Sequence, residues 1–289
     1  MNPTVTARTL AVPGARLHYE VRGDGPLVAL IGAPMNADSF APLADLLSAD
    51  HTVLTADPRG INRSSVDDPD ADSTPELRAA DLARLITHLD AGPATVFGSS
   101  GGAGTALALV QAHPEQVRAV IAHEPPLGEL LDDRDQVRAN TADMIATHLA
   151  GDATGAWRKF LAQANIFLPE PVFQQMFGGE REPRQFADER FWFAHELLPS
   201  TCWQPDLAAL RAVASRVAIG VGEESAGQFC DRTSNALAAA LGIEPTAFPG
   251  GHIGFVDDPA AFDTRLREVL SASFPAPWGA WDSTATPSE

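Results

Sequence analysis

Residues 94–104, ATVFGSSGGAG, decide the fold of this chain. Their apolar beginning predicts a short buried strand, and residues 105–110 continue as a helix. Between the two, Gly98-Ser99-Ser100-Gly101-Gly102 fits the G-x-S-x-G pattern of a nucleophile elbow, with Ser100 at its centre. A strand that turns directly into a helix strains the central residue, so its neighbours must be small. The pattern predicts an accessible Ser100 hydroxyl and a Gly101 N–H aimed at a developing oxyanion.

Composition indicates an ordinary globular enzyme. The 289-residue chain is 45% hydrophobic with a mean hydropathy of −0.06. It has no apolar run long enough to span a bilayer, and residues 1–8 lack the apolar core of a signal peptide. Its two cysteines, Cys202 and Cys230, are too few for a disulfide framework and lack metal-binding spacing. We therefore expect a cytoplasmic protein, with no metal and no cofactor.

The net charge narrows the class of partner. A formal charge of −18 disfavours binding to nucleic acid and to anionic membrane surfaces. It is compatible with a neutral or apolar small-molecule substrate, and a homodimer is compatible with the sequence as well.

Strand and helix patterns alternate along most of the chain. A hairpin over residues 9–21 is followed by strands at 27–31 and 51–56, a capped helix at 74–89 and a strand at 118–122. After a long interruption come a strand at 213–221, a helix at 225–241, a strand at 246–248 and a helix at 259–270. This alternation predicts an α/β fold with a mostly parallel, twisted sheet flanked by helices.

The interruption predicts an inserted helical lid. We expect residues 1–125 and 206–273 to form the α/β core, residues 126–205 the lid, and residues 274–289 a disordered tail. Helices are predicted in the lid at 127–150, 153–164, 171–177 and 183–198. Most of the many lid aromatics should pack the lid onto the core. Candidates for an apolar substrate pocket are Pro34, Met35, Trp157, Phe160, Trp192, Phe193 and Ile253.

Taken in order, these features resemble the α/β-hydrolase fold over nearly residues 5 to 272. The resemblance rests on the Gly32-Ala33 loop after a buried strand, the Asp57-Pro58-Arg59-Gly60 turn, the elbow at Ser100 and the late Pro249-Gly250-Gly251-His252 loop. A serine hydroxyl is a weak nucleophile until an imidazole takes its proton. His252 is the candidate base, because in this fold the base comes last in chain order.

The acid of the triad has two candidate positions. In most hydrolases of this fold it is an Asp in a Gly-x-x-Asp pattern after the penultimate strand, where this chain has Gly222-Glu223-Glu224-Ser225. Ser225 cannot serve as an acid, and Glu223 or Glu224 would be out of register. The other position follows the strand after the elbow helix, where Glu124 precedes two prolines. We favour Glu124, with Glu223 and Glu224 as the alternatives.

The Glu124 position narrows the resemblance. Three parts of the chain are similar to the zearalenone-type lactone hydrolases. They are the Ser100 segment, the Glu124 segment, and the His252 loop followed by Val256, Pro259 and Phe262. That similarity implies Ser100, Glu124 and His252 as the triad, with Gly32 or Ala33 and Gly101 as oxyanion donors. The oxyanion loop and the lid show no residue-by-residue match, so the resemblance extends to the triad and does not specify the substrate.

The expected reaction is hydrolysis of an ester or lactone of a mainly apolar small molecule through an acyl-enzyme. An Asp nucleophile would indicate dehalogenase or epoxide hydrolase chemistry, and Ser100 argues against both. C–C bond hydrolysis, acyl transfer, and cofactor-free oxygenation or perhydrolysis also occur on this fold. A ligand-binding sensor with vestigial hydrolysis is the alternative outside enzyme catalysis. It would show slow or single-turnover hydrolysis.

Overall fold

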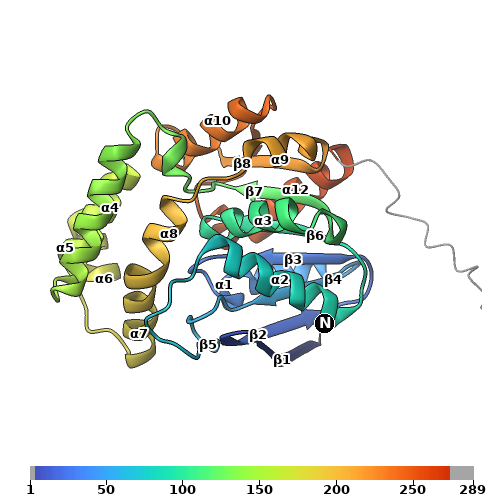
Figure 1. Ribbon diagram of the computed structural model, residues 1–289, viewed down its shortest axis with the longest axis horizontal. Coiled ribbons are helices and arrows are strands. Elements are labelled where there is room, and N and C mark those ends of the chain that lie inside the picture. The colour runs from blue at the N-terminus through green and yellow to red at the C-terminus, as the bar shows by residue number, and fades with distance from the viewer. Residues whose placement is uncertain (1–3, 274–289) are drawn as a thin grey trace, which may run out of the picture.

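The computed structural model describes residues 4–273, and its centre is one mixed sheet (Figure 1). The strands are β1 (Val5–Val12), β2 (Ala15–Arg22), β3 (Leu27–Ile31), β4 (Thr52–Ala56), β5 (Ser65–Val66), β6 (Ala94–Ser99), β7 (Val117–His123), β8 (Val217–Gly222) and β9 (Thr246–Phe248). They lie in the order β1-β2-β4-β3-β6-β7-β8-β9, and β5 pairs with β2. β2 is antiparallel to β1, β4 and β5, whereas the strands of the run β4-β3-β6-β7-β8-β9 are parallel to one another. The predicted α/β fold is confirmed.

Both faces of the sheet are covered by helices, which explains the continuous apolar strands. Successive side chains of a strand point to opposite faces. On β3, Leu27, Ala29 and Ile31 therefore pack in one core with α2 (Pro75–Leu89), α3 (Gly101–Ala112) and α10 (Phe229–Leu241). Val28 and Leu30 pack in the other with α1 (Ala37–Leu47) and α12 (Pro259–Ser273). The parallel strands direct their carboxyl ends to one edge, where ligands bind in such sheets.

Between β7 and β8 the chain leaves the sheet and forms a helical insertion, seen to the left of the sheet in Figure 1. It contains α4 (Arg134–Leu149), α5 (Ala153–Ala164), α6 (Glu170–Phe177), α7 (Pro183–Phe191), a π-helical turn (Trp192–Glu196) and α8 (Leu197–Thr201). An apolar cluster that includes Trp192, Phe193 and Leu197 holds these helices together and reaches Ile61 of the core. The predicted tail, residues 274–289, lies outside the described residues.

Several predicted boundaries are wrong. The helix predicted at 127–150 begins at Arg134, after a 3-10 turn at Gly128–Leu130. The helix predicted at 183–198 is interrupted by the π-helical turn, which inserts an extra residue into the helical hydrogen-bond ladder. The strand predicted at 213–221 begins at Val217, because Ala214–Arg216 form a 3-10 turn after the short helix α9 (Leu207–Ala212). The helix predicted at 225–241 begins at Phe229.

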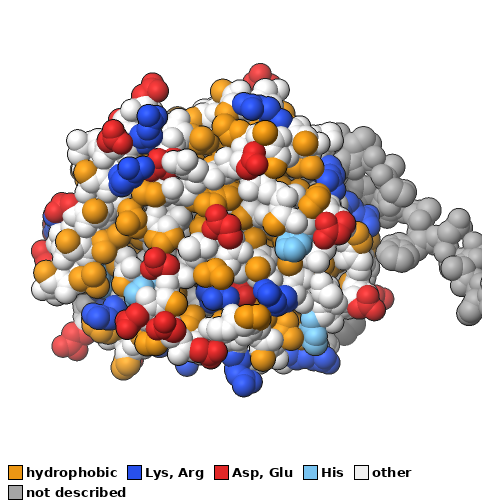
Figure 2. Space-filling view, in the orientation of Figure 1, with side chains coloured by type: hydrophobic (Ala, Val, Ile, Leu, Met, Phe, Trp, Pro, Cys, Tyr) orange, Lys and Arg blue, Asp and Glu red, His pale blue; other side chains and the backbone are white. Residues whose placement is uncertain are grey.

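Two remaining features bear on the molecule's surroundings. In the described part of the chain, no helix has both the length and the apolar character needed to cross a bilayer. Figure 2 shows one face of the molecule, on which lysine and arginine side chains are dispersed among acidic and apolar ones. This face therefore offers no continuous basic surface.

Candidate active site

Ser100 lies at the sharp turn between β6 and α3, as the elbow pattern predicts. Its backbone angles, φ 56° and ψ −127°, are of a kind that side chains rarely adopt. The turn is closed by close backbone approaches at its glycines. A Cβ on Gly98 would lie 2.4 Å from the carbonyl oxygen of Gly102, and one on Gly102 would lie 2.4 Å from that of Ile31. The small residues are therefore required by the packing of the elbow.

Glu124 directly follows β7, and its carboxylate is fully buried. The backbone N–H of Gly222, at the end of β8, donates to Oε1 at 2.8 Å. Nδ1 of His252 lies 2.6 Å from Oε2. Burial opposes ionisation, but the hydrogen bond from His252 and the charge of its ring outweigh it. The pKa of Glu124 is consequently lowered to about 2. Glu124 is thus an anion that fixes the orientation of the His252 ring.

His252 lies in the loop after β9, with 27% of its side chain exposed. Burial disfavours the imidazolium, yet the neighbouring Cys230 and the carboxylate of Glu124 more than compensate, and the pKa of His252 is raised above 6.5. Because Nδ1 donates to Glu124, Nε2 is the nitrogen available to a reacting group. The alternative acids, Glu223 and Glu224, are exposed. Ser225 is fully buried at the position where most relatives of this fold carry an Asp.

Two of the predicted oxyanion donors, Ala33 and Gly101, lie beside Ser100 in the structure. Gly101 is the first residue of α3, so its N–H has no partner within the helix. The loop after β3 touches it, since a Cβ on Gly101 would lie 2.7 Å from the carbonyl oxygen of Ala33. Ala33 and Gly101 both line the pocket that contains Ser100. Gly32, the alternative donor, faces a separate cavity with Asp57 and Arg59.

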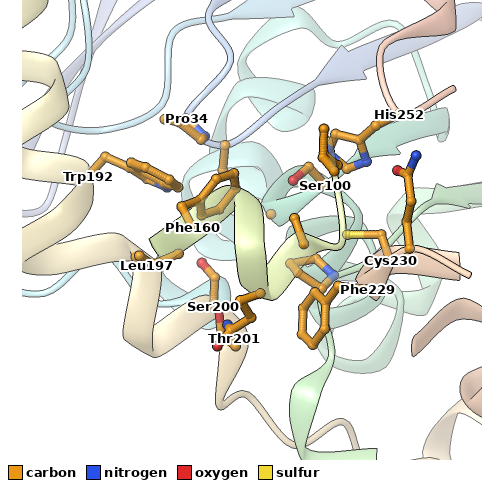
Figure 3. Close-up of a pocket in the computed structure, with 17 residues that line it drawn as sticks. Pro34, Ser100, Phe160, Trp192, Leu197, Ser200, Thr201, Phe229, Cys230 and His252 are labelled. Atoms are coloured by element: carbon orange, nitrogen blue, oxygen red, sulfur yellow. The ribbon is translucent and has the colours of Figure 1, made fainter. Parts of the chain in front are cut away.

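A largely apolar pocket joins the elbow to the insertion (Figure 3). Ser100 and His252 lie at one end in this view, Pro34 and Trp192 at another, and Ser200 and Thr201 below. The remaining lining is Ala33, Gly101, Pro126, Phe160, Gln163, Ala164, Ile166, Leu197, Gln228, Phe229 and Cys230.

The structure brings three of the seven predicted pocket residues to this cavity: Pro34, Phe160 and Trp192. The other four do not line it. Met35 packs against the core on the α1 side of the sheet, and Ile253 points outward with 43% exposure. Trp157 stacks on Phe177 and Trp192, and Phe193 stacks on His148. These two aromatics hold the helices of the insertion to one another, whereas the expected role of most aromatics in this region was to pack it onto the core.

His123 is separate from this chemistry. Its ring is fully buried beside Phe97, Phe248 and Phe262, and burial lowers its pKa to about 4. Its Nδ1 lies 3.2 Å from the hydroxyl of Ser99. It is therefore a neutral packing residue behind the elbow.

Sequence reasoning missed Cys230 and Ser200. Cys230 lies on α10 and Ser200 on α8, and nothing in the local sequence of either links it to Ser100. Glu124, Cys230 and His252 each offer one atom able to bind a metal, and these three atoms lie within 4.8 Å of one another. The absence of a metal stays a prediction, since this donor set is also that of a hydrogen-bonded acid and base beside a thiol.

Comparisons with known proteins give consistent results. The family model of the alpha/beta hydrolase fold matches residues 25–164. An uncharacterized hydrolase, YraK of Bacillus subtilis, is 31% identical over 272 residues, which is 92% of this chain and 97% of that protein. A zearalenone hydrolase of Bionectria ochroleuca is 26% identical over 278 residues, covering 91% and 97%. The structure of a thermophilic esterase from Thermogutta terrifontis superposes with a TM-score of 0.69 at 20% identity, covering 95% of this chain and 100% of that one.

Proposed function

Because the chain belongs to the α/β-hydrolase family, we propose that it is a serine hydrolase that cleaves an ester or lactone of a mainly apolar small molecule through an acyl-enzyme. One observation carries this proposal. The 2.6 Å contact between Glu124 and His252 holds an imidazole in the same pocket as an elbow serine. The relative that hydrolyses zearalenone supports a lactone among the substrates.

The first half of the reaction forms the acyl-enzyme. Nε2 of neutral His252 takes the proton of Ser100, whose oxygen attacks the carbonyl carbon. The oxyanion is stabilised by the N–H groups of Ala33 and Gly101, and Glu124 stabilises the imidazolium. The imidazolium then protonates the leaving alkoxide, and the C–O bond breaks.

The second half releases the acid. His252 deprotonates a water molecule, which attacks the acyl carbonyl, and Ser100 leaves with the returned proton. Phe160, Trp192 and Leu197 come from the insertion and cover one side of the pocket. We therefore propose that residues 126–205 act as the lid, and that its apolar side chains select the acyl or ring portion of the substrate.

The proposal is tested by intact mass after treatment with a fluorophosphonate, together with turnover of an aryl ester. We expect one adduct on the wild type, and neither adduct nor turnover in Ser100→Ala. In subtilisin, loss of the nucleophile costs about 10⁶ in kcat. Circular dichroism checks that the variant is folded. An unlabelled wild type, or turnover retained in Ser100→Ala, would remove the serine mechanism.

A further inference from the structure

A pair of charged side chains is buried directly behind the pocket. Arg78, on α2, is 4% exposed, and Glu196, in the π-helical turn, is 0% exposed. The closest approach between Arg78 Nη1 and Glu196 Oε2 is 3.9 Å, and neither carboxylate oxygen has a hydrogen-bond partner among the described residues. Burial raises the pKa of Glu196 to about 7 although Arg78 lowers it. The positive charge of Arg78 is therefore weakly compensated by its nearest carboxylate.

The guanidinium group of Arg78 instead donates to neutral oxygens. Nε donates to the hydroxyl of Thr105 at 3.0 Å, and Nη1 donates to the hydroxyl of Ser73 at 3.1 Å and to its carbonyl oxygen. Nη2 donates to the hydroxyl of Ser200 at 2.9 Å. Arg78 does not line the pocket, but Ser200 does. The hydroxyl of Ser200 is consequently the group that connects the buried guanidinium of Arg78 to the pocket.

The hydrogen of that hydroxyl is available. Ser200 Oγ accepts from Arg78, so its O–H must donate elsewhere. Within residues 4–273, no acceptor for it is found, in contrast to the hydroxyls of Thr141 and Thr147, which donate to the carbonyls four residues earlier. The Ser200 side chain lies on the wall of the pocket away from Ser100 and His252 in the close-up view (Figure 3).

We propose that Ser200, polarised by Arg78, is a specificity residue that donates a hydrogen bond to an oxygen of the substrate remote from the scissile carbonyl. This inference rests on the proposed function. A donor that is itself bonded to a cation is stronger than an isolated hydroxyl. In a largely apolar pocket, one such donor discriminates between substrates that carry the oxygen and those that lack it.

The oxygen that Ser200 binds is neutral. The hydrogen-bonding capacity of Arg78 is largely used within the protein, so a carboxylate would meet one hydroxyl and not the guanidinium. A single hydroxyl does not repay the desolvation of an anion in an apolar pocket. The substrate class is therefore an apolar ester or lactone with a ketone, ether or phenol oxygen.

The test uses p-nitrophenyl heptanoate and the corresponding esters with a ketone at carbon 4, 5 or 6. We expect the wild type to prefer the best-placed oxo ester over heptanoate by about three- to tenfold in kcat/KM, the range of one hydrogen bond. In Ser200→Ala this ratio should fall to about one, and Ser200→Thr, which keeps the hydroxyl, should restore it. Thr201→Val, at the next pocket residue, should keep the preference. If Ser200→Ala fails to fold, Ser200→Cys replaces it, since a thiol is a weak donor of similar size.

Binding separates this inference from the proposed function. The ethyl esters of the same acids are titrated calorimetrically into Ser100→Ala, with and without Ser200→Ala. A preference for the oxo ester that disappears without the Ser200 hydroxyl supports the subsite even if no ester is hydrolysed, in which case only the hydrolase proposal fails. No preference for any oxo ester in binding or turnover would overturn the inference. The inference would also be overturned if the protein preferred, over every oxo ester, the corresponding half-ester of a dicarboxylic acid, whose chain ends in a carboxylate.

Discussion

The two sides of the pocket are built in different ways. On the core side, Ser100, Glu124 and His252 follow β6, β7 and β9, and backbone contacts fix them: Gly98 against Gly102, and the Gly222 N–H on Glu124. On the lid side, side-chain contacts fix the pocket wall, namely stacked aromatic rings and the buried hydrogen bond from Arg78 to Ser200. Backbone geometry tolerates few substitutions, whereas side-chain packing can be rebuilt. The core should therefore set the reaction and the lid the substrate.

The largest effect should come from the core side. In Glu124→Gln the amide can hold the ring but cannot stabilise the imidazolium. We expect kcat to fall by about 10⁴, as when the triad carboxylate of a serine protease becomes an amide. Glu223→Gln is the matched control, because that exposed side chain lies on the neighbouring loop and should leave kcat within twofold. Steady-state kinetics on one aryl ester measures both. A larger loss in Glu223→Gln would assign the acid to that loop.

These core positions show how far the sequence predicts the site. Local patterns reveal the elbow glycines, the Gly-rich His252 loop and the order of the strands. The carboxyl ends of the strands in a parallel sheet then meet at one edge. The meeting of Glu124 with His252 followed from that geometry. Because Ser225 stands at the usual Asp position, the sequence left Glu223 and Glu224 open beside the favoured Glu124, and the structure brings Glu124 within 2.6 Å of His252.

The lid was less predictable for a physical reason. Helix periodicity predicted α5. The sequence does not distinguish those of its apolar residues that face neighbouring helices from those that face the pocket. Trp157 and Phe160 lie on the same helix, yet Phe160 lines the pocket while Trp157 stacks within the lid. The pocket hydroxyl of Ser200 depends on the π-helical turn before it, for which no sequence signal was available.

The second effect concerns pH and again lies on the core side. Catalysis needs neutral His252, so activity should be full above its pKa and fall about tenfold for each pH unit below it. Because Cys230 and Glu124 raise this pKa, the acid limb of kcat/KM should lie above pH 6.5. In Glu124→Gln the limb of the residual activity should move to lower pH. The rate of fluorophosphonate labelling against pH provides the same information without a substrate. A wild-type limb below 6.5 would contradict the environment described for His252.

The smallest effect should come from the lid and should depend on the substrate. Phe160→Ala removes an aromatic side chain from the pocket wall, and the lost apolar contact is worth about 2 kcal/mol, or roughly thirtyfold in kcat/KM for a long apolar ester. The loss should be small for an acetate ester, and fluorophosphonate labelling should be little changed, because the nucleophile and its base are on the other wall. Phe167→Ala is the matched control, since Phe167 follows α5 with 90% of its surface exposed. Wild type should also prefer apolar acyl groups to charged ones. Equal losses for acetate and for long esters would mean that the lid supports the catalytic geometry itself, and the division between the two sides of the pocket would not hold.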